Sequence, residues 1–367
     1  MSKSSTLSYR WSDHPEGGTL REVAPTVQWL KMPLDGGLDH INLYLLEDDD
    51  GWFVVDTGWN DDRTERLWDG IFEAHLSGKP IKGVICTHFH PDHIGQAAMI
   101  TDRFRCPLYM TFKEYYQALS FAGGSRRSQS WQAADFYARA GMTKTFSNDL
   151  RKMMDRGNPM AKQVMPTSFQ RIEHGDVLTI GGHDWRIVVG SGHSPEHACL
   201  HCAGLRLLIS GDQVLPVITS NVSVFPNEPE ANPLKLWLES HERLLDLPAD
   251  TLVLPAHNLP FVGVRERLRS LIDHHADRML AIEEHCVEPR KAVELIPVLF
   301  KRELNFIGTM MALGEVIAHL HQLMHHRRIE RKLHEDGAYR FTSIDPSLPQ
   351  GVHLRGHMDP DDAPMMV

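Results

Sequence analysis

The chain has 367 residues, of which 42% are hydrophobic and 23% are charged, with a formal net charge of −10 at neutral pH. This length predicts two domains, or one large domain with additions, around a sizeable core. The acidic balance argues against a general binder of nucleic acid or of anionic membranes. Five cysteines form no disulfide framework, and neither a signal core nor an apolar run of about 18 residues is found, so we expect a cytoplasmic protein without membrane contact.

The N-terminal part predicts the start of an antiparallel sheet. Residues 1–25 are polar and contain Gly and Pro, which indicates a surface arm. Strands are expected over 27–32, 40–47 and 52–55, with a hairpin turn at 48–51, and a helix over 61–77. Asp56 follows the third strand directly. Its carboxylate is placed to hydrogen-bond a metal-ligating imidazole, although a plain turn aspartate is the alternative.

A buried strand over 81–86 is followed by the run Thr-His-Phe-His-Pro-Asp-His at 87–93. Imidazole nitrogens and carboxylate oxygens are ligands of zinc and similar metals, and alternating histidines in an extended loop can point the same way. A histidine-rich surface loop without function is the alternative, but four potential ligands within six residues favour a metal site. These ligands are His88, His90, Asp92 and His93.

Residues 111–165 change character, because they are mostly helical and rich in methionine and aromatic residues. Such an insertion after a metal motif predicts a cap that supplies an apolar wall for the substrate. The alternative is that these aromatic residues form a small core of their own.

Three later strands each end in a further potential ligand. The strand over 185–189 leads to His193, the one over 205–209 leads to Asp212, and the one over 251–254 leads to His257. A strand end is a rigid place for a ligand, and several of them in one sheet are hard to ascribe to chance. His197 either lines the pocket or packs in the core, and we do not count it as a ligand.

In combination these segments resemble the metallo-β-lactamase superfamily of binuclear metallohydrolases. The resemblance rests on Asp56-Thr57-Gly58, on the run from His88 to His93, and on Gly192-His193, Gly211-Asp212 and His257. It implies an α/β fold, the αββα sandwich, for a catalytic domain over 26–262. It also implies that His88, His90 and His193 hold one metal, that Asp92, His93 and His257 hold the other, and that Asp212 bridges them.

The branch of the superfamily is partly indicated by Asp212, because the β-lactamases proper generally lack this aspartate. Its presence is similar to the glyoxalase II, lactonase, thioesterase and ribonuclease branches. The ribonucleases carry a winged-helix-like module, and residues 263–342 show the matching order of helices followed by a hairpin. However, residues 265–340 hold 13 Lys and Arg against 12 Asp and Glu, which is no basic footprint. Residues 343–367 are expected to be a tail.

The sequence therefore predicts a hydrolase with two divalent metal ions, zinc by preference, although iron or manganese also suits these ligands. A hydroxide that bridges the metals would attack a small-molecule carboxylic ester, thioester or lactone, and Asp92 would orient it or move its proton. One alternative is a metal-dependent endoribonuclease acting on RNA. The other is a noncatalytic regulator that binds nucleic acid. A homo-oligomer is compatible with the extra helical surface.

Overall fold

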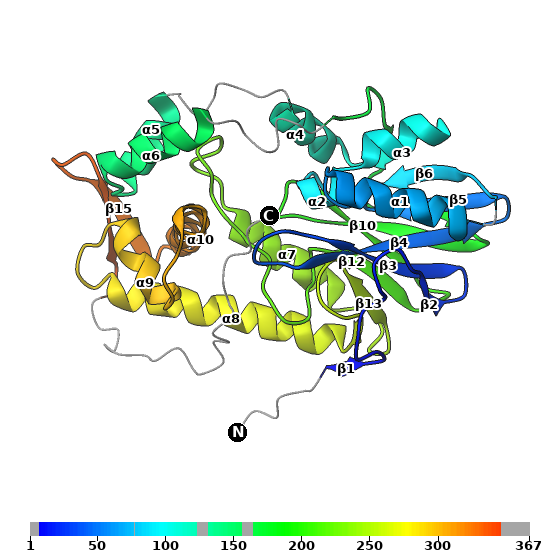
Figure 1. Ribbon diagram of the computed structural model, residues 1–367. Coiled ribbons are helices and arrows are strands. Elements are labelled where there is room, and N and C mark those ends of the chain that lie inside the picture. The colour runs from blue at the N-terminus through cyan, green and yellow to red at the C-terminus, as the bar shows by residue number, and fades with distance from the viewer. Residues whose placement is uncertain (1–6, 77, 123–130, 156–163, 346–367) are drawn as a thin grey trace.

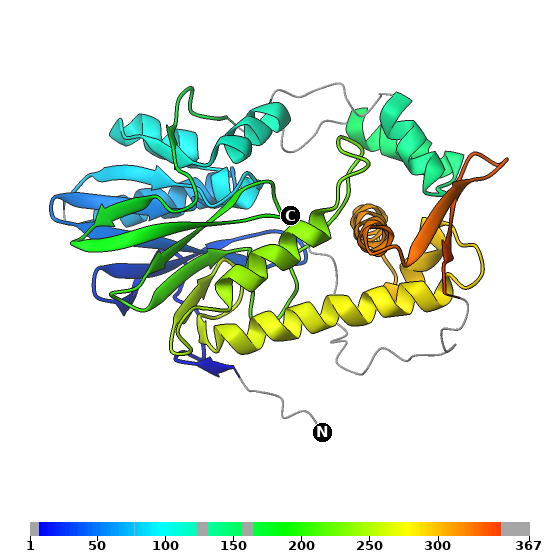
Figure 2. The ribbon, with the colours of Figure 1, turned by 180° about the vertical axis from the view of Figure 1, so that it is seen from behind.

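The computed structural model describes residues 7–76, 78–122, 131–155 and 164–345. Two seven-stranded sheets lie against each other, with helices on both outer faces (Figures 1 and 2). The first sheet has the strand order β2-β3-β4-β5-β6-β7-β8 and the second the order β1-β14-β13-β12-β11-β10-β9. The αββα sandwich that the resemblance implied is therefore confirmed.

The strands of the first sheet come from the N-terminal half of the chain. They are β2 Arg21–Ala24, β3 Val27–Pro33, β4 His40–Asp48, β5 Gly51–Val55, β6 Ile81–Ile85, β7 Leu108–Met110 and β8 Gln170–Arg171. Pairing is antiparallel from β2 to β5 and parallel from β5 to β8. The parallel part brings the carboxyl ends of β5 and β6 to the same edge, where the metal motif begins.

The second sheet is built from later strands and from one short N-terminal strand. They are β1 Ser8–Tyr9, β9 Val177–Ile180, β10 His183–Gly190, β11 His197–Cys202, β12 Leu207–Gly211, β13 Leu252–Pro255 and β14 Phe261–Val262. Strands β12 and β13 are parallel. The predicted surface arm over 1–25 is corrected in part, because β1 and β2 pair with β14 and β3 and so belong to the sheets.

Three hydrophobic layers hold the sandwich together. Trp29 and Trp185 are buried between the two sheets, Trp68 is buried between the first sheet and its helices, and Trp237 is buried behind the second sheet. The helices over the first sheet are α1 Asp62–Ala74, α2 Pro91–Ile94, α3 Ala97–Phe104 and α4 Phe112–Ala122, and those behind the second are α7 Pro233–Leu244 and α8 Val264–His285. Removal of these apolar surfaces from water is the main driving force for the assembly.

The predicted insertion over 111–165 divides between the two halves of the molecule. Helix α4 packs on the first sheet, whereas α5 (Trp131–Arg139) and α6 (Lys144–Asp155) lie beside α10 and β15 (Figure 1). Phe146 of α6 stacks on Phe306 of α10 with a ring separation of 4.7 Å. The described aromatic residues of the insertion therefore join two existing cores instead of forming one of their own.

The C-terminal part follows the expected order of helices and hairpin. After α8 come η3 Ala292–Leu295, α9 Ile296–Leu299, α10 Phe306–His325, β15 Ile329–Leu333 and β16 Tyr339–Ser343. One hydrophobic cluster runs from α7 and the second sheet through α8 and α10 to this hairpin, so the packing is continuous across the boundary predicted at 262. The winged-helix assignment stays a prediction, and most of the predicted tail lies outside the described residues. Within the residues that the structure describes, no helix is long and apolar enough to span a membrane.

Buried imidazoles connect α7, α8 and α10. His275 Nδ1 lies 3.0 Å from His319 Nε2, and the ring of Trp237 lies 3.5 Å from the ring of His241 and 4.7 Å from that of His275. Burial lowers the pKa of His241 and of His319 to about 3, and it lowers the pKa of His275 well below its ordinary value. These three side chains are therefore neutral in the fold.

The fold should lose stability on acidification. Below about pH 6.5 an unfolded chain protonates these three histidines, while the folded chain does not, so the free energy of unfolding falls by up to ~1.4 kcal/mol per pH unit for each of them. The loss begins near pH 6.5 and continues down to the folded pKa. Urea denaturation at pH 7, 6 and 5 in the presence of a chelator measures it.

The matched variant is His319→Gln, which removes one titrating group. Its free energy of unfolding should depend less steeply on pH than that of the unaltered chain over the same interval. Equal slopes for the two proteins would exclude this origin of acid sensitivity.

Candidate metal centre

The potential ligands follow the ends of strands from both sheets. Asp56 follows β5, the run from His88 begins three residues after β6, and Asp212 and His257 follow β12 and β13. Asp56 has a φ of 58°, in the left-handed region that non-glycine residues seldom occupy. In this conformation its Oδ1 accepts the backbone N–H of Thr87 at 2.7 Å and its Oδ2 accepts the Thr87 hydroxyl at 2.8 Å. The strained residue thus attaches the end of β5 to the start of the metal motif.

The structure brings together a first cluster of four predicted ligands, His88, His90, His193 and Asp212, whose ligand atoms all lie within 4.8 Å of one another. His88 Nε2 is 2.8 Å from His90 Nδ1 and 3.3 Å from His193 Nε2, and His193 Nε2 is 3.3 Å from Asp212 Oδ2. Residues 105 positions apart in the sequence, His88 and His193, are therefore neighbours at one edge of the sandwich.

A second cluster adjoins the first and consists of Asp92, His93 and His257. Asp92 Oδ2 lies 3.5 Å from Nε2 of His93 and 3.5 Å from Nε2 of His257. Asp212 also reaches this cluster, because its Oδ1 is 3.3 Å from His257 Nε2 and its Oδ2 is 3.6 Å from His93 Nε2. Asp212, a member of the first cluster, thus also lies beside the second.

The hydrogen bonds around these rings direct their lone pairs inward. His93 Nδ1 donates to Asp56 Oδ2 at 2.7 Å, His193 Nδ1 donates to the carbonyl of Asn221 at 2.8 Å, and His257 Nδ1 donates to the carbonyl of His40 at 2.9 Å. In the neutral ring, whose one proton then sits on Nδ1, Nε2 presents a lone pair to its cluster, which is the arrangement of a metal-binding histidine.

Several atoms inside the clusters lack the partners that buried polar groups require. Within the described residues, no hydrogen bond is formed by the carboxylate oxygens of Asp92 and Asp212 or by Nε2 of His93 and His257, all of which are buried. So many buried oxygen and nitrogen lone pairs in one space repel one another unless a cation lies among them. The donor set, nitrogen and oxygen only, fits divalent zinc and also iron or manganese.

The protonation states of His88, His90 and Asp212 agree with a ligand role. Burial and the neighbouring imidazoles hold the pKa of His88 and of His90 well below the ordinary value, so both rings are neutral. Burial alone would raise the pKa of Asp212, but the imidazoles of His257 and His93 hold it well below its usual range. Neutral imidazole and ionised carboxylate are the forms that bind metals. Burial lowers the pKa of His93 and of His257, but the neighbouring carboxylates outweigh it and raise both.

Three contributors to this centre were not among the predicted site residues. His197, which we did not count as a ligand, accepts the backbone N–H of Asp212 with its Nε2 at 3.1 Å and stacks on His88 at 4.8 Å. Asn221 fixes His193 through its carbonyl, as described above. Glu114 of α4 is fully buried and contacts the backbone of the loop with His88 and of the loop with His193. Only His197 gave a signal in the sequence, because it lies in the same loop run as His193, whereas the other two lie in segments without a motif.

Asn221 also connects the centre to the C-terminal helices. Its Nδ2 donates to Glu315 Oε2 on α10 at 3.4 Å, and Glu315 Oε1 forms a buried ion pair with Arg278 Nη1 on α8 at 2.6 Å. The helices after residue 262 therefore contribute to the surroundings of His193.

Close packing around the ligand loops requires glycine at two positions. A Cβ at Gly192, where φ is 107°, would lie 2.4 Å from Cβ of Trp237, and a Cβ at Gly211, where φ is 49°, would lie 2.6 Å from Cε1 of His197. The glycines of the two later motifs thus let the chain approach α7 and the His197 ring.

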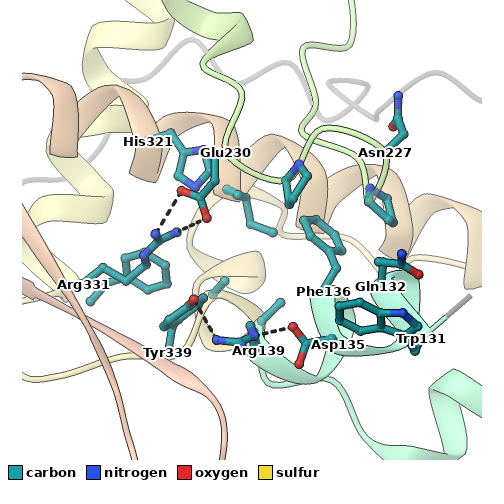
Figure 3. A pocket seen from close by; sticks show the side chains of 16 residues that line it. Trp131, Gln132, Asp135, Phe136, Arg139, Asn227, Glu230, His321, Arg331 and Tyr339 are labelled. Carbon is teal, nitrogen blue, oxygen red and sulfur yellow. Dashed lines mark hydrogen bonds and ion pairs between the residues drawn. The ribbon is translucent and has the colours of Figure 1, made fainter.

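A pocket of about 450 Å³ lies elsewhere, among α5, α10, the β15–β16 hairpin and the loop before α7 (Figure 3). None of its lining residues is a predicted metal ligand. Its arginines are engaged by other lining residues, since Arg331 pairs with Glu230 at 2.9 Å and Arg139 pairs with Asp135 and donates to Tyr339 at 2.9 Å (Figure 3). The described lining therefore offers no unpaired arginine for an anionic ligand.

Comparison with known families gives two matches that together span most of the chain. The family described as the metallo-beta-lactamase superfamily matches residues 36–257, and the one described as the metallo-beta-lactamase-like C-terminal domain matches residues 279–344. The first match contains every predicted metal ligand.

Individual proteins of similar sequence or structure are consistent with these family matches. A beta-lactamase domain protein of Burkholderia ambifaria has a crystal structure with a TM-score of 0.85, at 41% identity over 92% of this chain and 98% of its own. A protein of Bacillus subtilis (strain 168) named "Probable metallo-hydrolase YybB" is 34% identical over 56% of this chain and 76% of its own length. A hydroxyacylglutathione hydrolase of Erythrobacter litoralis (strain HTCC2594) is 25% identical over 39% of this chain and 57% of its own length.

Zinc should stabilise the fold. At a free zinc concentration 100 times the dissociation constant, each occupied site raises the free energy of unfolding by about 2.7 kcal/mol, because the unfolded chain does not assemble the site. Denaturant titrations of chelator-treated protein with and without added zinc measure this difference.

The control is the double variant His193→Ala/His257→Ala, which removes one predicted ligand from each cluster. Its stability should respond little to zinc. An equal response of the two proteins would show that zinc acts elsewhere.

Proposed function

The chain belongs to the metallo-beta-lactamase superfamily, and from this membership and the geometry of its site we propose a binuclear metal-dependent hydrolase of carboxylic esters, thioesters or lactones. In this proposal His88, His90 and His193 hold one divalent ion and Asp92, His93 and His257 hold the other. Asp212 is shared, and zinc is the expected metal.

The observation that carries the binuclear assignment is the position of the Asp212 carboxylate. Oδ1 lies 3.3 Å from His257 Nε2 of the second cluster, and Oδ2 lies 3.3 Å from His193 Nε2 of the first. A carboxylate whose oxygens together reach both groups of ligands suits two cations held side by side. Two such ions lower the pKa of water and polarise the scissile carbonyl when they are bound.

The residues of the chain then have separate tasks. Asp92 is buried beside His93 and His257. In this proposal it would orient the attacking water and take its proton. Asp56 holds the His93 ring, and His197 holds the backbone of Asp212. No nucleophilic side chain is needed in this scheme, because the attacking group comes from water.

Small-molecule acyl substrates have more support than nucleic acid. The hydroxyacylglutathione hydrolase among the relatives is named for a thioester substrate. By contrast, three arginines of the C-terminal hairpin region are paired with carboxylates: Arg328 with Glu283, Arg331 with Glu230, and Arg340 with Asp336. Paired guanidinium groups add little attraction for phosphates. The endoribonuclease and the noncatalytic regulator therefore gain no support from the described part of the chain.

Metal-loaded protein should hydrolyse at least one of a panel of aryl esters, acyl thioesters and acyl lactones. Asp92→Asn should lower kcat/KM by about 10²- to 10⁴-fold, because it removes the proton acceptor and a predicted metal ligand. His90→Ala should lower kcat/KM strongly as well. Chelation should abolish turnover, and added zinc should restore it.

His75→Ala is the matched control, because His75 ends α1 and belongs to neither cluster. It should retain the activity of the unaltered chain. If protein shown to contain two metals turned over no member of the panel, the acyl-hydrolase proposal would be refuted. Metal-dependent cleavage of single-stranded RNA would then support the endoribonuclease instead.

A further inference from the structure

Glu114 is a buried carboxylate that the proposed reaction does not use. It is the third residue of α4, and its side chain is shielded from water. Among the ion pairs of the described residues, none includes Glu114. Burial raises its pKa to about 7, against the effect of the backbone N–H groups that it accepts. Burial of a carboxyl group destabilises the fold unless the group forms hydrogen bonds with its surroundings.

Two hydrogen bonds of Glu114 reach the two loops that carry the three histidines of the first cluster. Its Oε2 accepts the backbone N–H of Phe89 at 3.0 Å, and its Oε1 accepts the backbone N–H of Glu196 at 2.6 Å. Phe89 lies between His88 and His90, and Glu196 lies three residues after His193. One carboxylate therefore spans two segments that are separated by about a hundred residues in the sequence.

Other contacts of α4, and of Thr111 just before it, reach only one of these loops at a time. The Thr111 hydroxyl donates to the carbonyl of Glu196 at 2.7 Å, and the backbone N–H of Lys113 donates to the Glu196 carboxylate at 3.1 Å. On the other side, the ring of Phe121 stacks on that of Phe89 at 5.2 Å with an interplanar angle of 7°. Glu114 is thus the side chain of α4 whose hydrogen bonds set one loop relative to the other.

We infer that Glu114 is a positioning residue that sets the distance between the His88–His90 segment and His193, and thereby the affinity of the first metal site. The inference rests on the proposed function in that these three histidines bind a metal. It also gives helix α4 a role in the centre that does not require contact with the substrate.

The chemistry of the side chain provides a sharp test. Glu114→Gln keeps the size of the side chain, but only the amide oxygen accepts a hydrogen bond, and the NH₂ group would face a second N–H. One of the two loops must therefore be released. Glu114→Asp keeps the charge but is one methylene shorter, so it also fails to span both loops. This variant replaces Glu114→Gln in the test if the glutamine variant does not fold.

Zinc affinity of the full-length protein should be measured for both sites by competition with a chromophoric chelator, and cobalt-loaded protein should be compared by absorption spectroscopy. Glu114→Gln is expected to weaken one of the two sites by about 10- to 100-fold, as loss of a residue that orients ligands does elsewhere. The other site should keep its affinity, and the cobalt spectrum should change.

Two controls separate positioning from general stability. Glu283→Gln alters another buried carboxylate, one that pairs with Arg328 at 2.7 Å away from the predicted ligands. Thr111→Val loosens the attachment of α4 to the His193 loop but leaves Glu114 in place. Both variants should bind zinc within about twofold of the unaltered chain, although both lose hydrogen bonds worth about 1 kcal/mol or more.

The outcomes are distinct. Unchanged zinc affinity and cobalt spectrum in Glu114→Gln, with two metals bound by the unaltered chain, would overturn the positioning role alone. An equal loss of affinity in Glu114→Gln, Glu283→Gln and Thr111→Val would also overturn it, because stability would then explain the effect. Failure of the unaltered chain to bind metal would overturn the proposed function and this inference together.

Discussion

The structure depends on the convergence of buried ligand groups at one edge of a sandwich. Nitrogen lone pairs and carboxylate oxygens from His88, Asp92, His93, Asp212 and His257 are all shielded from water there. Burial of such groups opposes folding unless each is paired or bound to a cation. The hydrophobic layers around Trp29, Trp68, Trp185 and Trp237 drive the assembly that brings them together.

The surroundings of the centre show how the ligands are held in place. Each of the outward-facing ring nitrogens of His93, His193 and His257 has a defined partner, and two of the three partners are backbone carbonyls. Backbone partners move only with the fold, so ring orientation is tied to the packing of both sheets. Asp56 is the exception, and its left-handed φ shows that the chain accepts local strain to place a carboxylate there.

The segments outside the sandwich contribute from two sides. On one side α4 supplies Glu114, and on the other α8 and α10 supply the Arg278–Glu315 pair that contacts Asn221, the partner of His193. The C-terminal region is thus packed into the same core as the catalytic half. Its arginines are used mainly within the chain, in ion pairs and in the pocket beside Tyr339.

The sequence by itself determined the α/β class and most elements. Strands show as short periodic patterns, and the predicted ligands mark where several of these strands end. It also singled out every residue of the two clusters, since histidines and aspartates at motif spacing leave a local signal. Tertiary structure decided what has no local signal: the split of the insertion between two cores, the short strands β1 and β2 within the expected arm, and the roles of Glu114 and Asn221. A single buried glutamate or asparagine acts through the segments that it meets, and those meetings arise from packing between distant parts of the chain.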